Sequence, residues 1–479
     1  MTLLDSPVVR SVVPVPPTIR LDELLAAVGG RLTGSSSVTS FRDATVDSRR
    51  VPPGSLFVAL RGERTDGHRH VADAVRAGAA VALVEAPQEL PGDLEAAVVV
   101  VPDALLALQE LAAWWRSRQA VRVVGITGST GKTLAKEITA DVLARTFRTL
   151  RNEGNLNSES GLPLTLLRLE PEHEIAVLEM SMYTVGEIAR LAEIARPEVG
   201  VVLAVHPTHL ERAGSIDRIA RAKAELPEAL PRDGLAVLNA DDPRVVAMRA
   251  VTAATCWTFG LGPAADVRAD DVVSHGVAGT EFTLHAPWGV RRLHTATPGR
   301  HLVPHALAAA AVAEWLGEPL DEVAAALEIG SAAPHRMAVH EGASGATIVD
   351  DTYNASPVSV TAALDFLAET PIPAGRRRIA VLGDMLELGH DEEQLHRAVG
   401  HHAARTADAI VTVGTRGTWI AEGARAGGAA LVLEAVDAEA AVLALDRDLA
   451  PTHGDVVLLK ASRGIELDRA VDVLLGITR

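Results

Sequence analysis

Cysteine is almost absent from this sequence of 479 residues. The single cysteine, Cys256, cannot form an intramolecular disulfide bond, and its neighbours Thr255 and Trp257 supply no base that would activate a catalytic thiol. We therefore interpret Cys256 as a small buried hydrophobic residue, and the chemistry of the chain has to be sought elsewhere.

Long apolar runs are also missing. No uncharged apolar stretch approaches the roughly 18 residues that a membrane-spanning helix needs. The first residues are apolar in places, but Arg10 and four prolines (Pro7, Pro14, Pro16 and Pro17) interrupt them, so they contain no signal-peptide core. The sequence predicts a cytoplasmic protein with no membrane partner.

Positive charge is scarce relative to negative charge. The 45 Lys and Arg residues are outnumbered by 62 Asp and Glu residues, which gives a formal net charge of -17. Such a charge opposes non-specific binding to nucleic acid or anionic lipid, because both partners would be negative. The composition favours a small-molecule substrate over a nucleic acid.

The length and the apolar pattern predict three α/β domains. Domains average about 150 residues, and 48% hydrophobic residues are ample for their cores. We place the domains at residues 1–103, 104–330 and 331–479, with a helix from Asp103 to Arg118 leading into the second. Expected strands lie at 56–60 and 79–84, then at 121–126, 174–179, 199–205 and 235–238, and finally at 346–349, 379–382, 409–413 and 456–459. The alternation of strands and helices predicts a doubly wound parallel sheet with helices on both faces in the second domain, and a Rossmann-like α/β fold in the third.

One segment of the second domain is a candidate phosphate-binding loop. An apolar run ends in Gly-Ile-Thr-Gly-Ser-Thr-Gly-Lys-Thr, residues 125–133. Glycines let the backbone N–H groups face an anion, and the following helix adds its positive N-terminal end. Lys132 can reach the outer phosphates, and the Thr133 hydroxyl can ligate Mg²⁺. The alternative is an ordinary glycine-rich turn between a strand and a helix.

Three further residues follow predicted strands of the same domain and are candidates for a site beside the phosphate loop. Glu179 ends one predicted strand, His209 follows the next, and Lys223 lies on the helix after that. The carboxyl ends of neighbouring parallel strands open onto one crevice, so Glu179 and His209 are placed to hold a cation beside a nucleotide. Taken alone, such residues are more often solvated or capping side chains.

The spacing of the loop resembles one family in particular. The common P-loop has a glycine where this chain has Ile126, whereas a shorter Gly-x-x-Gly-Lys-Thr core is similar to that of the Mur ligases and their folylpolyglutamate synthase relatives. Other motifs of the Mur ligases recur in the same order: Asp47-Ser-Arg49, Gly54–Leu60 and Asp66-Gly-His68 near the start, then Asn155-Leu-Asn157, Gly161–Leu167, Ala222–Glu225 and Leu238–Asp242. The resemblance covers the chain from about residue 20 to its end.

The third predicted domain, residues 331–479, resembles the family member that adds D-alanyl-D-alanine. The segments that carry this resemblance are Asp350–Pro357, Leu382–Gly389 and Lys460–Arg463. The resemblance implies an ATP-dependent ligase of peptidoglycan precursor synthesis, with a UDP-binding first domain, an ATP-binding second domain and a third domain that closes on ATP and binds the amine. It implies UDP-N-acetylmuramoyl-tripeptide and D-alanyl-D-alanine as substrates, an acyl-phosphate intermediate and a monomer. A sister ligase adding another amino acid and a catalytically weakened paralogue are the alternatives.

The resemblance also implies roles for individual residues. Lys132, Glu179, His209 and Lys223 would be catalytic, with two Mg²⁺ sites formed by Thr133, Glu179, His209 and a Lys223 carbamate. The ATP contacts would be Gly128, Ser129, Thr130, Gly131, Lys132, Thr133, Asn239, Arg336 and Asp351. The other substrates would contact Ser48, Arg49, Asn155, Asn157, Asn354 and Lys460.

Several positions depart from the family pattern. Leu302 and His305 stand where the family usually has asparagines, the first of which normally helps to hold adenine. Ser158, Ser181, Ser356 and Ala461 replace other family residues. None of these changes removes a residue that would handle phosphate or metal, so we expect altered adenine and amine pockets rather than lost catalysis.

Overall fold

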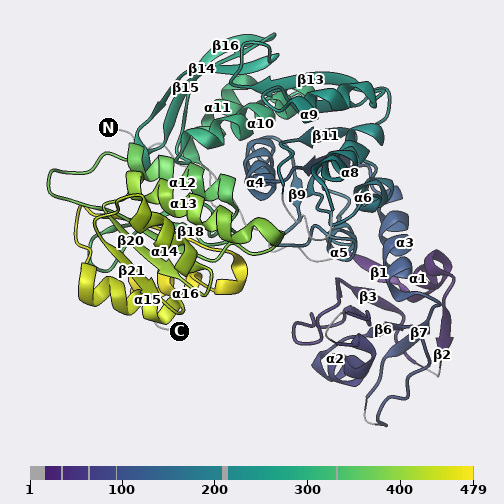
Figure 1. Cartoon of the computed structure of the whole chain (residues 1–479). Helices are drawn as coiled ribbons and strands as arrows, with labels where there is room; N and C mark the ends of the chain where they lie inside the picture. The colour runs from purple at the N-terminus through teal and green to yellow at the C-terminus, as the bar shows by residue number, and fades with distance from the viewer. Residues whose placement is uncertain are drawn as a thin grey trace, which may run out of the picture. The chain divides into compact units, whose positions relative to one another are not determined.

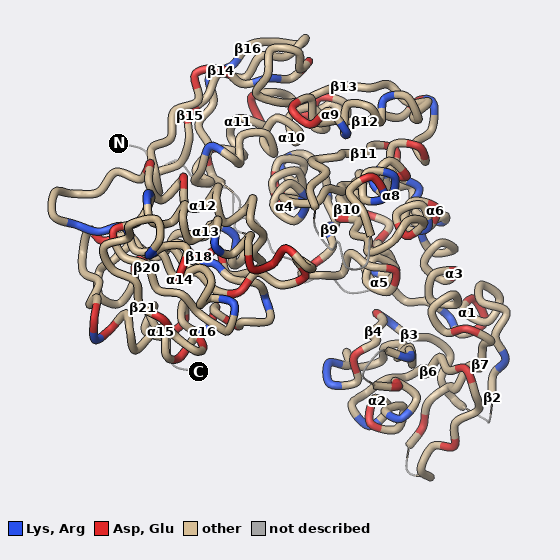
Figure 2. The backbone as a smooth tube through the Cα atoms, viewed as in Figure 1, with Lys and Arg blue, Asp and Glu red and all other residues tan. Residues whose placement is uncertain are grey.

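A computed structural model describes residues 17–33, 36–62, 65–92, 94–207, 214–330 and 333–477 of the chain (Figure 1). The candidate ligand His209 lies outside these ranges. Within them, no helix has both the length and the apolar character that crossing a bilayer requires. Acidic and basic residues are interspersed along the backbone (Figure 2).

The chain divides into two compact units. The first contains the residues up to Val121 together with Asn152–His173. The second contains Arg122–Arg151 and the residues from Glu174 onward.

The first unit is built on a small mixed sheet with strand order β2-β7-β6-β5-β4, parallel except for β2, and a short antiparallel ribbon of β1 and β3. Strands β5 and β6 are the segments that the apolar runs predicted. The strands are β1 (Thr18–Arg20), β2 (Arg31–Thr33), β3 (Ser40–Arg42), β4 (Ala44–Thr45), β5 (Leu56–Val58), β6 (Val81–Val84) and β7 (Ala97–Val100), and the helices are α1 (Leu21–Val28), α2 (Val71–Ala77), α3 (Ala104–Ser117) and α5 (Gly161–Leu166).

The segment that contains α5 is joined to α3 by two hydrogen bonds on either side of the helix. The Gln109 side chain donates to the Glu159 carbonyl (3.1 Å), and the Trp115 indole donates to the Leu169 carbonyl (3.0 Å). A segment that follows the phosphate loop in the sequence therefore packs with the N-terminal module.

The second unit contains a large sheet with strand order β16-β15-β14-β13-β12-β11-β8-β10-β9. Its pairs are parallel from β9 to β14 and antiparallel from β14 to β16. The strands are β8 (Arg122–Thr127), β9 (Thr149–Arg151), β10 (Ile175–Glu179), β11 (Val199–Val202), β12 (Leu235–Asn239), β13 (Thr255–Gly260), β14 (Val267–Ser274), β15 (Thr280–Ala286) and β16 (Gly289–Thr295), and the helices are α4 (Lys132–Leu143), α6 (Glu187–Ala195), α8 (Ile216–Glu228), α9 (Pro243–Ala247), α10 (Val303–Leu316) and α11 (Leu320–Ile329).

Helix α10 brings a distant part of the chain to the phosphate loop. Its residues Ala306–Ala313 are all buried, and the helix packs against α4. Alanine side chains are short, so little separates the two helix backbones at this contact. His305, in the first turn of α10, lies against Gly131, the residue before α4.

A second sheet of the same unit has the order β17-β18-β22-β19-β20-β21, parallel except for β17. Strand β22 lies between β18 and β19, and it pairs in parallel with β18 so that Lys460 stands opposite Asp351 at the carboxyl ends of the two strands. The strands are β17 (Ala338–Glu341), β18 (Thr347–Asp351), β19 (Arg378–Gly383), β20 (Ala409–Val413), β21 (Val432–Ala435) and β22 (Val456–Lys460), and the helices are α12 (Pro357–Glu369), α13 (Glu392–Thr406), α14 (Gly417–Ala426), α15 (Ala438–Ala444) and α16 (Asp468–Leu474).

These sheets and their covering helices confirm the predicted α/β fold class. The antiparallel edge of the large sheet, β14 to β16, was not predicted, because we expected parallel alternation throughout the second domain.

Candidate functional site

The candidate phosphate loop connects β8 to α4. Gly131 has a φ of +78°, a left-handed conformation that glycine adopts without steric cost, and it is the residue before the helix. A Cβ atom built at Gly131 would lie 2.1 Å from His305 Nε2, so the position has no room for a side chain. The loop therefore presents backbone N–H groups and the start of α4, an arrangement that suits an anion.

The loop is fastened to the segment that follows β11. The Ser129 N–H donates to the Ala204 carbonyl (2.8 Å), and the Ser129 hydroxyl donates to the His206 carbonyl (3.0 Å). From the other side, the Asn239 amide donates to the Leu203 carbonyl (2.7 Å). Two residues that the resemblance assigned to ATP thus use their side chains to position the segment that leads to His209.

A hydroxyl and a carboxylate meet at the start of α4. Thr133 Oγ1 donates to Glu179 Oε2 over 2.7 Å, and both residues are buried. Hydroxyl and carboxylate oxygens are the ligands that Mg²⁺ prefers, so the donor set fits this ion. No cluster of three or more His, Cys, Asp or Glu side chains suited to a metal occurs in the described ranges, which exclude His209.

The half-buried Lys132 and the buried Lys223 lie near this pair. Lys132 donates to the Gly128 carbonyl (2.9 Å), and burial lowers the pKa of its ammonium, although Glu179 opposes the shift. Lys223 on α8 is 3% exposed, and burial lowers the pKa of Lys223 well below its usual value, with the charge of Lys132 acting in the same direction. The Lys223 amine therefore loses its proton more readily than an exposed lysine, which leaves a lone pair for chemistry.

Arg336 reaches the same place from the segment before β17. Its Nη2 donates to Thr133 Oγ1 over 2.8 Å, across 203 residues of sequence. The flanking residues His335 and Met337 have φ values of +59° and +53°, an uncommon conformation for non-glycine residues. His335 Nδ1 lies 2.7 Å from Asp350 Oδ2, and this contact helps to hold the segment in place.

Asp351, Asn354 and Lys460 meet at the carboxyl ends of the neighbouring strands β18 and β22. Lys460 Nζ lies 2.5 Å from Asp351 Oδ2 and donates to the Asn354 carbonyl over 2.9 Å. Burial raises the pKa of Asp351, and the neighbouring Lys460 acts against that shift. The structure thus pairs a residue expected to contact ATP with one expected to contact another substrate.

The two departures from the family's asparagines differ in their surroundings. Leu302 is 4% exposed and belongs to the hydrophobic core of the second unit, so its side chain presents no open face. His305 packs against Gly131, its Nδ1 is buried, and burial lowers its pKa to about 4, with Arg336 adding to the shift. The contact between His305 and the loop depends on helix packing, and no sequence motif indicated it.

Four of the residues expected to contact the other substrates belong to the first unit: Ser48, Arg49, Asn155 and Asn157. The guanidinium of Arg49 pairs with Asp47 over 2.8 Å, and this pairing holds the pKa of Asp47 at about 2. Ser48 is half-buried in the same turn. Asn155 is exposed and Asn157 is half-buried, and both belong to the segment that packs with α3.

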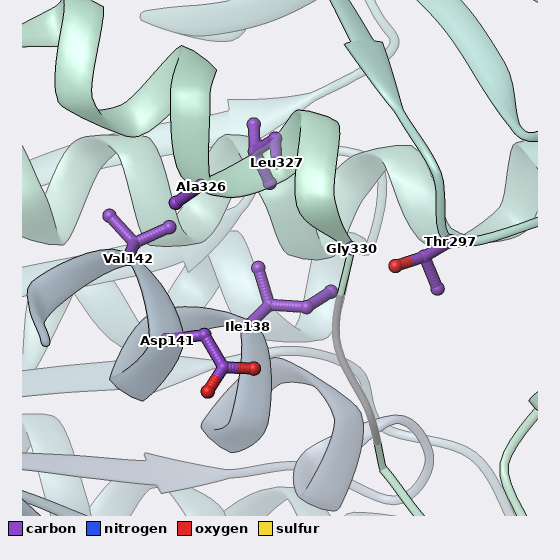
Figure 3. Close-up of a pocket in the computed structure, with 7 residues that line it drawn as sticks. All are labelled: Ile138, Asp141, Val142, Thr297, Ala326, Leu327 and Gly330. Atoms are coloured by element: carbon purple, nitrogen blue, oxygen red, sulfur yellow. The ribbon is translucent and has the colours of Figure 1, made fainter. Parts of the chain in front are cut away.

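A small recess between α4 and α11 is separate from this chemistry (Figure 3). Its α4 residues lie in the second half of that helix, whereas the phosphate loop precedes the first half. Its lining is mostly apolar: Ile138, Asp141, Val142, Thr297, Ala326, Leu327 and Gly330. We interpret it as a packing defect rather than a binding site.

Three family models match successive parts of the chain. They are the Mur ligase family, catalytic domain (residues 43–116), the Mur ligase middle domain (126–313) and the Mur ligase, glutamate ligase domain (335–463). The middle-domain match contains the phosphate loop, Glu179 and Lys223, and the third match contains Arg336 and Lys460.

Similar proteins of known name cover nearly the whole chain. The UDP-N-acetylmuramoyl-tripeptide--D-alanyl-D-alanine ligase of Escherichia coli is 37% identical over 95% of this chain and 98% of its own length. The protein of the same name from Bacillus subtilis is 35% identical over 91% and 94%.

Solved structures agree with these sequence matches. A crystal structure of MurF from Acinetobacter baumannii has a TM-score of 0.86 and 32% identity, covering 97% of this chain and all of that one. MurF ligase from Thermotoga maritima in complex with ADP has a TM-score of 0.78 and 30% identity, covering 91% and 97%. Since this identity extends over almost the full length of several relatives, the chain belongs to the Mur ligase family.

Proposed function

We propose that this protein is an ATP-dependent ligase that adds D-alanyl-D-alanine to UDP-N-acetylmuramoyl-tripeptide during peptidoglycan precursor synthesis in the cytoplasm. The observation that carries the proposal is the hydrogen-bonded group of Thr133, Glu179 and Arg336 at the phosphate loop. Lys132 interacts electrostatically with Glu179, and the buried Lys223 interacts with Lys132. The activity is that of the named relatives, which match 95% and 91% of this chain.

Amide formation from a carboxylate needs activation, because oxide is a very poor leaving group. In the proposed first step, an oxygen of the tripeptide carboxylate attacks the γ-phosphorus of ATP, and the bond to ADP breaks. In the second step, the dipeptide amine attacks the carbonyl carbon of the acyl phosphate. A C–N bond forms, the C–O bond breaks, inorganic phosphate leaves, and the amine gives up a proton.

The chain's own residues would lower the barrier by holding charge. Lys132 and Arg336, which lie at the phosphate loop, would neutralise phosphate oxygens as the first step proceeds. Thr133, Glu179 and His209 would hold Mg²⁺, which supplies further positive charge to the phosphates when it is bound. The N–H groups of the loop would bind and orient the phosphate chain of ATP.

We also propose that Lys223 carries a carbamate in the active enzyme. The support is its burial and its lowered pKa, because only the neutral amine can add to CO₂ with loss of a proton. The product is an anionic oxygen ligand in place of a cation. Active protein labelled with ¹³CO₂ should show a carbamate carbon signal that Lys223→Ala lacks. A bare ammonium in fully active protein would contradict this assignment.

For the other substrates, we propose that the first unit binds the UDP-sugar end through Ser48, Arg49, Asn155 and Asn157. The third block, residues 331–479, would bind the amine near Asn354. Lys460 would then serve the substrate indirectly, by holding Asp351 and the Asn354 backbone in position through its contacts with them.

The test is a coupled ADP-release assay over a matrix of acceptors and amines. The expected result is turnover only with UDP-N-acetylmuramoyl-tripeptide and D-alanyl-D-alanine together. Preference for a single amino acid would indicate a sister ligase. Binding of nucleotide and acceptor without any ADP release would indicate a weakened paralogue.

A further inference from the structure

The Arg336 guanidinium has a planar face and N–H edges, and only the edges can donate hydrogen bonds. Its central carbon lies 4.1 Å from the centroid of the Tyr353 ring, so an aromatic face covers the cation. One edge donates from Nη2 to Thr133. The Nε atom is buried and has no hydrogen-bond partner among the described residues. Leaving a buried donor unpaired is costly, so this edge is suited to an acceptor that a ligand supplies.

Tyr353 and Arg336 are fixed to the same backbone frame. The Tyr353 N–H donates to the His335 carbonyl over 3.1 Å, and the His335 ring contacts Asp350 at the end of β18. The residues on both sides of Arg336 have left-handed backbone conformations, so the backbone turns sharply at this arginine. The ring and the cation therefore stay together as one unit.

The chemistry of the ring also suits this place. Burial raises the pKa of the Tyr353 phenol, although Arg336 opposes the shift, so the ring carries no negative charge at neutral pH. A carboxylate in its position would pair with the guanidinium edges and compete with an incoming anion. An aromatic face attracts the cation, and the buried Nε–H stays without a partner among the described residues.

We propose that Tyr353 is a positioning residue, whose ring holds the Arg336 guanidinium beside Thr133 with its Nε edge directed to a phosphoryl oxygen of the bound nucleotide. This inference rests on the proposed ATP-dependent function. Tyr353 itself would touch no reacting atom and would act through Arg336.

The first test measures ADP affinity by calorimetry, together with KM for ATP and kcat, in variants of Tyr353. A cation–π contact of this kind corresponds to roughly a 3- to 30-fold change in affinity. Tyr353→Leu should weaken ADP and raise KM for ATP by that factor, whereas Tyr353→Phe, which keeps the ring, should stay within about twofold. Tyr353→Gln is a second ring-free variant for this half-buried position, should the leucine variant not fold.

The second test asks whether Tyr353 acts through Arg336. In an Arg336→Ala background, Tyr353→Leu should change ADP affinity no further. Trp114→Leu is the matched control, because it removes another arginine–aromatic contact, with Arg118 at 5.0 Å, in the first unit. It should leave ADP affinity unchanged.

Three results would overturn the inference in folded protein: wild-type ADP affinity in the ring-free variants, equal damage from phenylalanine and leucine, or additive effects with Arg336→Ala. A wild-type protein that binds ADP but ligates nothing would instead contradict the proposed function. In that case the ADP measurements still decide the role of Tyr353.

Discussion

Replacing Gly131 with alanine should damage the second unit more than an equivalent change elsewhere. The new Cβ would lie 2.1 Å from His305 Nε2, far inside contact distance, and it would sit at a φ of +78°. The left-handed conformation costs about 1 to 2 kcal/mol for a non-glycine residue. Relief of the overlap costs about 1 to 3 kcal/mol more. We therefore expect a total destabilisation of about 2 to 5 kcal/mol.

Gly317 provides the matched control on the same helix as His305. It has a φ of +89°, but a Cβ built there meets nothing within 4 Å. Gly317→Ala should therefore cost only the conformational part, about 1 to 2 kcal/mol. The double variant Gly131→Ala with His305→Ala should recover the part of the loss that is due to overlap.

The assay is thermal unfolding followed in the near-ultraviolet by circular dichroism. Trp257 lies 5.1 Å from Trp288 and 5.6 Å from Trp315 between ring centroids, so the large sheet carries its own aromatic signal. ADP affinity is measured alongside. The reasoning is refuted if Gly131→Ala is as mild as Gly317→Ala, or if removing the His305 ring restores nothing.

Three other predictions concern charge in the site. Lys132→Ala should lower kcat by about 100- to 1000-fold, because such a contact is worth about 3 to 4 kcal/mol in the transition state, while the unfolding temperature stays the same. Glu179→Gln should raise the Mg²⁺ concentration needed for half-maximal rate, since one anionic ligand is lost; an unchanged Mg²⁺ requirement would remove Glu179 from the ion's ligands. Unfolded His305 binds a proton near pH 6.5 and folded His305 only near pH 4, so the free energy of unfolding should fall as pH drops through that window. His305→Asn should make this dependence less steep in urea titrations at pH 4 to 7.

The strand and helix around the phosphate loop were predictable because local residues decide them. The apolar run, the glycine before the helix and the start at Lys132 all lie within a dozen residues. Strand β15 also has a local signal in the sequence, since polar and apolar residues alternate along Glu281–Ala286, and the structure buries Phe282 and Leu284. Because we expected strands and helices to alternate throughout the second domain, this antiparallel strand was not predicted.

Contacts between distant residues could not be predicted in the same way. Lys460 and Asp351 are 109 residues apart, and Arg336 and Thr133 are 203 apart. No spacing rule links positions so far apart; the order of β18 and β22 and the packing of whole elements bring them together. The same is true of His305, whose place depends on how α10 packs against α4.

The most direct test of the account follows the oxygen atoms of the acceptor. UDP-N-acetylmuramoyl-tripeptide labelled with ¹⁸O in its terminal carboxylate is incubated with the protein, ATP, Mg²⁺ and D-alanyl-D-alanine, and the released phosphate is analysed by mass spectrometry. The acyl-phosphate route predicts one ¹⁸O atom in each phosphate and one ADP for each amide bond. Unlabelled phosphate, or release of AMP and pyrophosphate, would contradict it.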